Sequence, residues 1–519
     1  MSKINAHTIH KTRSVVGNIS VSLVILLMVC LAIISPAQAE AKRVGADFPL
    51  VDSYIESQMK DLHIPGIALA IVQGDQIAYL HGYGEAGPGK GLVTPQTPFM
   101  IGSVTKSFTA LAVMQLVDAG QVELDAPVQT YLPWFSVADP QASAQITVRH
   151  LLNQNSGFSR ASGLEEEMAS DLSDEAIESG VRRLGDDVLS SAPGTMYAYS
   201  NVNFNILGLI VQTLSGQSYE SYIQEHIFDP LEMRHSFTSQ AQALQAGMAK
   251  GHLMWFGIPF AKDVPFNRGG LPNGFLISSA EDMAHFLIAQ LNQGRYGNGS
   301  VLSPQGIQAM HQPAVPTGTP GEYYGMAWDI GENDGKPVVY HSGDNANFSS
   351  YVIMQPEEEL GVVLLENANG LFVNNSHSQL AKGVLAVMAG KQPQPYAAPI
   401  EAFVEPVGSL VVPVVISVLW IAWMAYRFIR RSKRGIPSQP GAWWYVWVIV
   451  LPFVVDIGLL LVLLVGIPML WGTPLNVMAT FFSDLFTLLI LSAIGLGAWG
   501  LVRPLLTLKQ AQSQPLASR

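Results

Sequence analysis

Three long apolar runs near the carboxyl end constrain this chain more than any other feature of its 519 residues. They cover about 408–426, 443–465 and 477–502. Each is close to or above the ~20 residues that a helix needs to cross a bilayer. Charged residues make up only 13% of the chain, about half the usual share, so part of it is expected to lie in lipid. We therefore predict three transmembrane helices over 408–505, followed by a cytoplasmic tail at 506–519.

The basic residues predict the orientation of these helices. The link 466–476 has none, Arg503 and Lys509 follow the third run, and five lie between the first and second runs: Arg427, Arg430, Arg431, Lys433 and Arg434. The positive-inside rule places such segments in the cytoplasm, which leaves residues 40–407 outside. Asp456 and Asp484 interrupt the second and third runs. Because no basic residue lies within either run, we expect these acids to contact each other, water or the membrane interface. A proton path or a coupling role is the alternative.

The amino-terminal segment 1–39 predicts a signal peptide. A basic stretch precedes an apolar run at about 21–34, and small residues then favour cleavage after Ala39. An uncleaved signal anchor is the alternative. The single cysteine, Cys30, lies in this segment, so the exported part would contain no disulfide and no cysteine-bound metal. Residues 391–407 contain four prolines and predict a stiff tether between residues 40–390 and the membrane.

The exported block combines strand and helix patterns. Residues 67–72 and 77–80 predict a β-hairpin, residues 107–118 a helix buried on nearly all sides, and residues 338–340, 349–354 and 361–366 successive strands. This order indicates an α+β fold with one antiparallel sheet. Residues 40–400 carry a net charge of −19, which argues against nucleic acid or an anionic membrane surface as a partner of this block.

The first candidates for chemistry are Ser103 and Lys106, at the start of the predicted buried helix. Side chains three apart on a helix share a face. A serine hydroxyl becomes a nucleophile when a base takes its proton, and burial can make a lysine amine that base. The helix amino terminus also offers N–H groups to an oxyanion. The alternative is a capping serine beside a surface lysine.

The second candidates are Tyr199 and Asn201, which precede an apolar stretch at 202–214 that predicts another buried helix. A phenol can relay protons, and an asparagine side chain can bind a substrate amide. The alternative is a packed tyrosine beside a helix-capping asparagine. Tyr296-Gly297-Asn298 has the same spacing but lies in a polar stretch typical of an exposed turn, so we exclude it.

The third candidate is His341-Ser342-Gly343-Asp344, directly after a predicted strand. A glycine at a strand edge lets the backbone approach a ligand closely. A lone histidine is more often structural than catalytic, so this motif gains meaning only together with the other two.

In this order the three motifs resemble the serine β-lactamase and penicillin-binding-protein family, in its class C and D,D-peptidase-like branch. The Tyr-x-Asn element in second place points to that branch. The resemblance spans about residues 51–388 and includes Ile64-Pro65-Gly66, Pro230-Leu231-Glu232-Met233 and Tyr324-Gly325-Met326-Ala327-Trp328. It implies the β-lactamase/transpeptidase-like fold, in which an antiparallel sheet is flanked by helices and joined by a mostly helical subdomain.

The resemblance also implies an acyl-enzyme mechanism without metal or cofactor. Its residues here would be Ser103 as nucleophile, Lys106 and Tyr199 for proton transfer, Asn201, His341 and Gly343 for substrate binding, and the backbone N–H groups of Ser103 and Asp344 as the oxyanion hole. Two positions depart from the family pattern. His341 stands where most β-lactamases have a lysine, which is a permanent cation suited to a substrate carboxylate. Asn153-Gln154-Asn155 stands where relatives often have His-Thr, a change that the sequence does not explain.

Three functions follow from these observations. The first is a membrane-tethered serine hydrolase acting on D-alanyl peptides of the cell wall or on β-lactam-like amides. The second is an esterase on the same scaffold, for example one that removes D-alanyl esters, which the histidine at 341 favours. The third is a non-catalytic sensor of wall fragments. The sequence leaves open the exact substrate, hydrolysis against transfer, and the oligomeric state.

Overall fold

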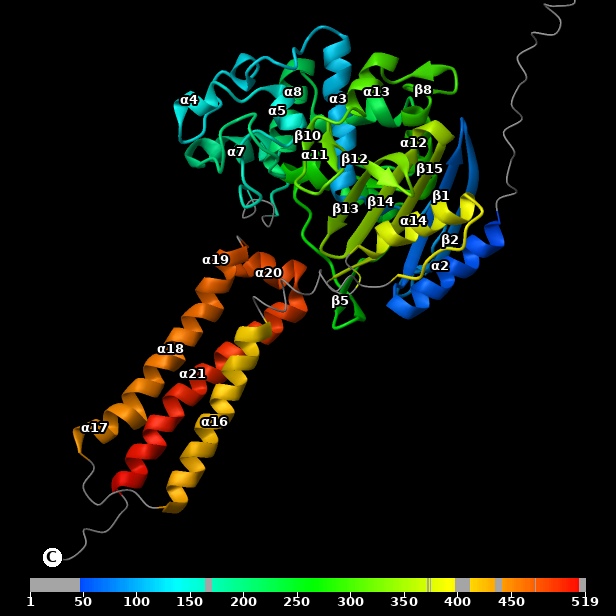
Figure 1. The fold of residues 1–519 in the computed structure, drawn as a ribbon. Helices are drawn as coiled ribbons and strands as arrows, with labels where there is room; N and C mark the ends of the chain where they lie inside the picture. The colour runs from blue at the N-terminus through cyan, green and yellow to red at the C-terminus, as the bar shows by residue number, and fades with distance from the viewer. Residues whose placement is uncertain are drawn as a thin grey trace, which may run out of the picture.

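The computed structural model describes residues 47–163, 170–370, 373, 375–396, 411–434, 441–471 and 473–512. A mixed α and β domain and a separate bundle of long helices make up these residues (Figure 1). The predicted signal peptide, much of the predicted tether and the last residues of the predicted tail lie outside the described residues.

A nine-stranded antiparallel sheet forms the centre of the domain, in the order β10-β11-β12-β13-β14-β15-β1-β2-β3. The strands are β1 (Gly66–Gln73), β2 (Gln76–Gly87), β3 (Gly91–Leu92), β10 (Val315–Pro316), β11 (Tyr323–Gly325), β12 (Trp328–Asn333), β13 (Lys336–Asn345), β14 (Phe348–Gln355) and β15 (Leu360–Glu366). The first hairpin closes against the last strand, since β1 pairs with both β2 and β15. This arrangement confirms the predicted hairpin, the predicted late strands and the α+β class.

The two faces of the sheet are covered by different helices because the side chains of each strand alternate between them. In β1, Ile67, Leu69 and Ile71 share a core with α2 (Phe48–Leu62) and α14 (Ser376–Met388). Ala68, Ala70 and Val72 point to the opposite, larger core. Figure 1 shows α2 and α14 on one side of the sheet and α12 on the other. Both faces of the central strands are therefore buried, which explains their near-continuous apolar sequences.

The described part of the domain also contains ten further α-helices and three small sheets. The helices are α3 (Thr105–Asp118), α4 (Pro140–Ser143), α5 (Val148–Leu152), α7 (Ala176–Arg183), α8 (Val202–Ser215), α9 (Tyr219–Ile223), α10 (Gln240–Gln245), α11 (Leu271–Gly274), α12 (Ala280–Leu291) and α13 (Pro304–Met310). The short strands β4 (Phe99–Met100) and β7 (Ile277–Ser278), β8 (Arg295–Tyr296) and β9 (Gly299–Ser300), and β16 (Ala368–Asn369), β5 (His252–Trp255) and β6 (Ile258–Ala261) form three small sheets. Eleven of the 14 residues of α3 are buried, so this helix passes through the core as predicted.

The carboxyl-terminal region contains three helical segments long and apolar enough to cross a membrane, at Val412–Arg430, Ala442–Trp471 and Ser483–Lys509. The first is α16 (Val412–Arg434) and the third is α21 (Ser483–Gln512). The second joins α17 (Ala442–Tyr445), α18 (Leu451–Leu461) and α19 (Ile467–Trp471) through two π-helical turns, and α20 (Leu475–Phe481) leads from it into α21. The described residues thus contain three candidate membrane-spanning helices, as predicted.

The expectation for Asp456 is wrong, because a basic residue does face it. Arg503 Nη1 lies 3.2 Å from Asp456 Oδ2, and both side chains are almost fully buried in the bundle. The indole of Trp420 donates a 2.7 Å hydrogen bond to the other oxygen of Asp456. Arg503 follows the third apolar run in sequence, but α21 continues to Gln512 and so brings Arg503 alongside α18.

Candidate active site

A short 3₁₀ turn carries Ser103 to the start of α3. The turn covers Gly102–Val104 and α3 begins at Thr105, so Ser103 and Lys106 lie one turn apart and on the same side. Lys106 Nζ donates a 3.0 Å hydrogen bond to Ser103 Oγ. The structure therefore joins the first predicted pair.

Lys106 is fully buried, and its ammonium group donates to two further acceptors. They are the side-chain oxygen of Asn201 at 2.8 Å and the backbone carbonyl of Asn273 at 2.8 Å. A buried ammonium is costly unless hydrogen bonds replace its water. Three acceptors from three segments of the chain supply these bonds and hold the amine against the serine. The carbonyl of Asn273 was not predicted, because nothing in a sequence marks a backbone oxygen as a ligand.

Tyr199, the second predicted partner of Ser103, also contacts the serine hydroxyl. Its hydroxyl donates a 2.6 Å hydrogen bond to Ser103 Oγ. Two cations lie over its ring, with Lys106 Nζ 4.9 Å and the guanidinium carbon of Arg160 5.9 Å from the ring centroid. Positive charge at these distances stabilises negative charge on the phenol oxygen while a proton is transferred. Arg160 was not among the predicted site residues.

Gln154 holds the segment that carries Tyr199. The buried side-chain oxygen of Gln154 accepts hydrogen bonds from the backbone N–H of Ser200 at 2.9 Å and from Asn203 Nδ2 at 2.5 Å. Its backbone carbonyl accepts from the N–H of Ala198 at 2.8 Å. Gln154 itself has a φ of +57°, an uncommon conformation for a non-glycine residue. The Asn153-Gln154-Asn155 run, unexplained from the sequence, thus fixes the backbone on both sides of Tyr199.

Gly102 and Gly343 allow two backbone segments to touch beside the serine. A Cβ on Gly102, whose φ is +51°, would lie 2.5 Å from the backbone nitrogen of Asp344. A Cβ on Gly343 would lie 2.1 Å from the carbonyl oxygen of Ile101. Both distances are too short for any side chain, so this close approach requires glycine at each position. It brings the backbone of Asp344 next to the turn that carries Ser103.

The edge of β13 is open where it passes the serine. β12 pairs with β13 only from Lys336 to Tyr340, and no described strand pairs with residues 341–345 on that side. On the other side β14 pairs with β13 up to Asn345. The side chain of Asp344 accepts hydrogen bonds from Ser349 Oγ at 3.1 Å and Asn369 Nδ2 at 3.2 Å. An open edge held in this way suits a backbone donor aimed at a ligand.

His341 lies in the same strand, but its side chain is only 2% exposed. Burial, and then the nearby ammonium of Lys106, lower the pKa of His341 to about 3, so its ring is neutral at pH 7. Nδ1 lies 2.5 Å from the carbonyl of Ser342, which assigns the proton to Nδ1. Nε2 then accepts from the hydroxyl of Tyr324 at 3.3 Å. His341 therefore lies close to the site, but its ring is buried in the protein. A neutral ring cannot provide the positive charge that would bind a substrate carboxylate.

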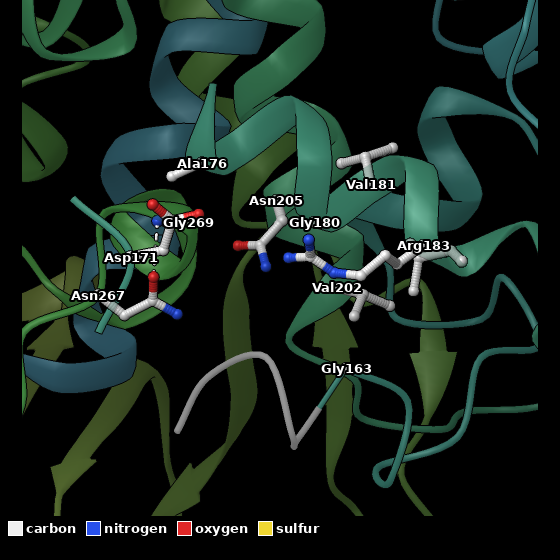
Figure 2. A pocket seen from close by; sticks show the side chains of 11 residues that line it. Gly163, Asp171, Ala176, Gly180, Val181, Arg183, Val202, Asn205, Asn267 and Gly269 are labelled. Carbon is white, nitrogen blue, oxygen red and sulfur yellow. Dashed lines mark hydrogen bonds between the residues drawn. The ribbon is translucent and has the colours of Figure 1, made fainter. Parts of the chain in front are cut away.

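A small pocket lies along α8, beyond Asn201 (Figure 2). Its polar lining includes Asp171, Arg183, Asn205 and Asn267, and Figure 2 shows the Arg183 and Asn205 side chains converging in it. Asn205 Oδ1 accepts a 2.9 Å hydrogen bond from Asn273 Nδ2, and the Asn273 carbonyl binds Lys106. The pocket therefore adjoins the serine site through Asn273.

One described group of side chains has the spacing of metal ligands: His235, Glu281 and Asp282. Asp282 already accepts hydrogen bonds from the backbone N–H of His235 and from Ser236 Oγ, both at 2.7 Å. These contacts give Asp282 a role in holding the chain at Ser236 against α12.

Comparisons with known proteins agree with this geometry. Residues 51–384 match the family model described as Beta-lactamase. "Penicillin-binding protein 4" of Amycolatopsis lactamdurans is 31% identical over 351 residues, which cover 65% of this chain and 90% of that protein. "Protein flp" of Staphylococcus aureus strain MW2 is 30% identical over 325 residues. That match covers 62% of this chain and 64% of the relative, so less than two thirds of the relative's length is spanned.

A solved structure shares the fold. The octameric penicillin-binding protein homologue from Pyrococcus abyssi superimposes with a TM-score of 0.59 at 29% identity. The superposition covers 67% of this chain and 78% of that one. The helices after residue 411 lie outside the family match.

Proposed function

The chain belongs to the Beta-lactamase family, whose members with this fold are serine hydrolases, and from this membership we propose that its domain acts outside the cell through an acyl-serine intermediate. The substrates we propose are D-alanyl peptides of the cell wall or related β-lactam-like amides. One observation carries the proposal: Ser103 Oγ lies within hydrogen-bond distance of both a buried amine and a phenol.

In the proposed first step, Ser103 Oγ attacks the substrate carbonyl carbon. For this step the Lys106–Tyr199 pair must hold one proton fewer than an ammonium and a phenol together. Its deprotonated member, with Nζ 3.0 Å or the phenol oxygen 2.6 Å from Oγ, accepts the serine proton. The same pair returns a proton to the leaving group as the acyl–leaving-group bond breaks. A positioned acid–base group of this kind contributes ~10²–10⁴ in rate.

The negative charge that develops on the carbonyl oxygen needs donors already in place. We propose the backbone N–H groups of Ser103 and Asp344, because Gly102 and Gly343 bring these segments into contact beside an open strand edge. The Asn201 side chain, held by Lys106, would bind the substrate amide with its NH₂ group. Water positioned beside Tyr199 would then release the acyl group.

The three apolar helices support a membrane anchor for this domain. Helix α16 runs away from the domain (Figure 1), and its second half contains the basic residues Arg427 and Arg430, as an extracytoplasmic domain would require. We propose that the anchor keeps the hydrolase close to its wall substrate. The signal peptide and the tether remain part of this proposal.

The test is acylation of the purified full-length protein, read by intact mass. We expect a fluorescent penicillin or a fluorophosphonate to add one adduct to the wild-type protein and none to Ser103→Ala. Ser107→Ala is a matched control, because Ser107 is buried and bonds to the carbonyl of Val104 within the helix. Equal labelling of wild type and Ser103→Ala would refute the mechanism. A folded wild-type protein that takes no adduct would favour the non-catalytic sensor.

A second candidate is an esterase that uses the same serine. The observation that favours the esterase is the state of His341, whose ring is neutral and buried. Most β-lactamases have a lysine cation at this position. Esters do not require a carboxylate beside the scissile bond. Turnover of p-nitrophenyl esters together with little turnover of nitrocefin or D-Ala-D-Ala peptides would support the esterase, and the opposite ranking would support the peptidase.

A further inference from the structure

The hairpin formed by β5 and β6 exposes an unusual set of apolar side chains. Strand β5 is buried as far as Met254, but the turn and β6 are not: Trp255, Phe256, Ile258 and Phe260 are 46, 40, 64 and 63% exposed. Trp255 pairs with Ile258 across the two strands, and Phe260 lies two residues further along the same strand, so these three share one face. A concentrated apolar patch of this kind marks a surface that contacts something else.

The turn at the tip adds an independent observation. Phe256 has a φ of +49° and Gly257 a φ of +77°, so both central residues of this two-residue loop are left-handed. Such a hairpin turn favours Asn-Gly or Asp-Gly. A phenylalanine there is unfavourable for both the backbone and solvation. An apolar ring kept at such a position indicates a gain from an apolar partner.

The hairpin points toward the helix bundle. Figure 1 shows β5 on the side of the domain that faces the junction of α20 and α21. The backbone N–H of Phe256 interacts with the carboxylate of Asp484, the second residue of α21. At the same end of the bundle the rings of Trp471 and Phe482 contact each other at 5.8 Å. Aromatic residues at this end are typical of the membrane–water boundary.

We propose that the tip of the β5–β6 hairpin docks into the interfacial layer of the bilayer, beside the outer end of α21. The partner is a phospholipid surface, at the boundary between headgroups and acyl chains. Tryptophan and phenylalanine favour this layer because their rings are apolar and planar. The inference rests on the proposed membrane anchor and not on the acyl-transfer chemistry.

Docking of the hairpin would set the height of the active site above the membrane. Its base is bonded to the core through His252 Nδ1, 2.9 Å from the carbonyl of Asn367, and through Asn347 Nδ2, which donates to the carbonyl of Lys262 at 2.8 Å. Asn369, in the strand beside β5, bonds to the side chain of Asp344. The hairpin and the proposed oxyanion strand are thus parts of one rigid unit.

The test places single environment-sensitive labels on the full-length protein in proteoliposomes. In a Cys30→Ser background, I258C carries the hairpin label, L461C a label on the lipid-exposed face of α18, and V188C a label on an exposed apolar site elsewhere in the domain. Spin-labelled lipids with the quencher near the headgroup or deep in the acyl chains then report depth.

We expect a blue shift at position 258 and loss of its fluorescence with shallow quenchers, loss at 461 with deep quenchers, and neither at 188. A label at 258 that behaves like the one at 188 would overturn the proposal. So would a blue shift at 258 without quenching, which would assign the patch to contact between copies of the chain. An unquenched label at 461 would overturn the anchor and this inference together, whereas acylation of Ser103 would be unaffected.

A second variant separates lipid contact from packing within the protein. Phe256→Asn creates the Asn-Gly pair that this turn favours, so the thermal stability should hold or rise. Quenching of the label at 258 should nevertheless fall, because an apolar ring has left the interface. Lower stability with unchanged quenching would mean that Phe256 packs inside the protein, contrary to the proposal.

Discussion

The hydroxyl of Tyr199 lies 2.6 Å from Ser103 Oγ and makes a shorter hydrogen bond to it than the 3.0 Å bond from Lys106. Tyr199→Phe removes this bond and leaves the ring. We expect kcat for acylation to fall ~10²–10⁴-fold because one acid–base group is lost. Stopped-flow acylation measures the effect, with the exposed Tyr323→Phe as control. Unchanged acylation would remove Tyr199 from proton transfer.

Gln154 is predicted to position Tyr199 without touching the substrate. Gln154→Met keeps the volume but removes the acceptor for Ser200 N–H and Asn203. We expect kcat to fall about tenfold or more, since small displacements of a reacting group are costly. Gln154→Glu, which keeps an acceptor oxygen, should restore part of the activity. If both variants lose stability but keep kcat, Gln154 is only structural.

Gly343 is predicted to be intolerant of any side chain. The Cβ of Gly343→Ala would meet the carbonyl of Ile101 at 2.1 Å and push the Asp344 N–H away from the serine. Loss of one oxyanion donor costs ~10²–10³ in kcat. Gly299→Ala is the control, because its nearest neighbour would lie at an ordinary 3.7 Å. Acylation rates and circular dichroism of both variants would separate a lost donor from a lost fold.

The sequence predicted those parts of the site that depend on side-chain type and local spacing. Ser103 and Lys106 share a helical turn, so their contact followed from the sequence. The buried environment of His341 did not, because it depends on Tyr324 and on the charge of Lys106, which other segments bring close. Likewise, Asn273 binds Lys106 through its backbone carbonyl, which a sequence does not mark. Gln154 holds the segment of Tyr199 from a left-handed backbone conformation that no local sequence pattern predicts.

The carboxyl-terminal helix bundle shows the same limit of prediction from sequence. Composition predicted three spans, but the Asp456–Arg503 pair depends on how far α21 continues and on which faces of α18 and α21 meet. Pairing across helices is a property of the packed bundle. Sequence spacing alone therefore suggested that Asp456 had no basic partner.

The buried Asp456–Arg503 ion pair is predicted to contribute to the stability of the helix bundle. Asp456→Leu alone should destabilise it strongly, by about 3–5 kcal/mol, because Arg503 is left without its counter-charge. Asp456→Leu combined with Arg503→Leu should recover most of the loss. Thermal unfolding in detergent, followed for all three proteins, measures the coupling. A double variant no more stable than the single would show that the pair does not interact energetically.

Glu366 predicts a pH dependence of the domain's stability. The residue is fully buried, and Ser376 donates a 3.0 Å hydrogen bond to it. Burial raises the pKa of Glu366 to about 8, and the nearby Asp344 adds to this shift despite the opposing effect of the Ser376 bond. The folded protein therefore holds a proton on Glu366 that the unfolded chain releases near pH 4.5.

Because the folded state binds the extra proton, this group destabilises the fold progressively as pH rises from about 4.5 to about 8. Glu366→Gln imitates the protonated form at every pH. We expect the variant to match the wild type in free energy of unfolding near pH 4.5 and to exceed it increasingly toward pH 8, by an amount on the order of a few kcal/mol, as measured by denaturant unfolding at each pH. The exposed Glu357→Gln is the control. A wild-type minus Glu366→Gln difference that does not change with pH would show that Glu366 is ionised in the folded protein.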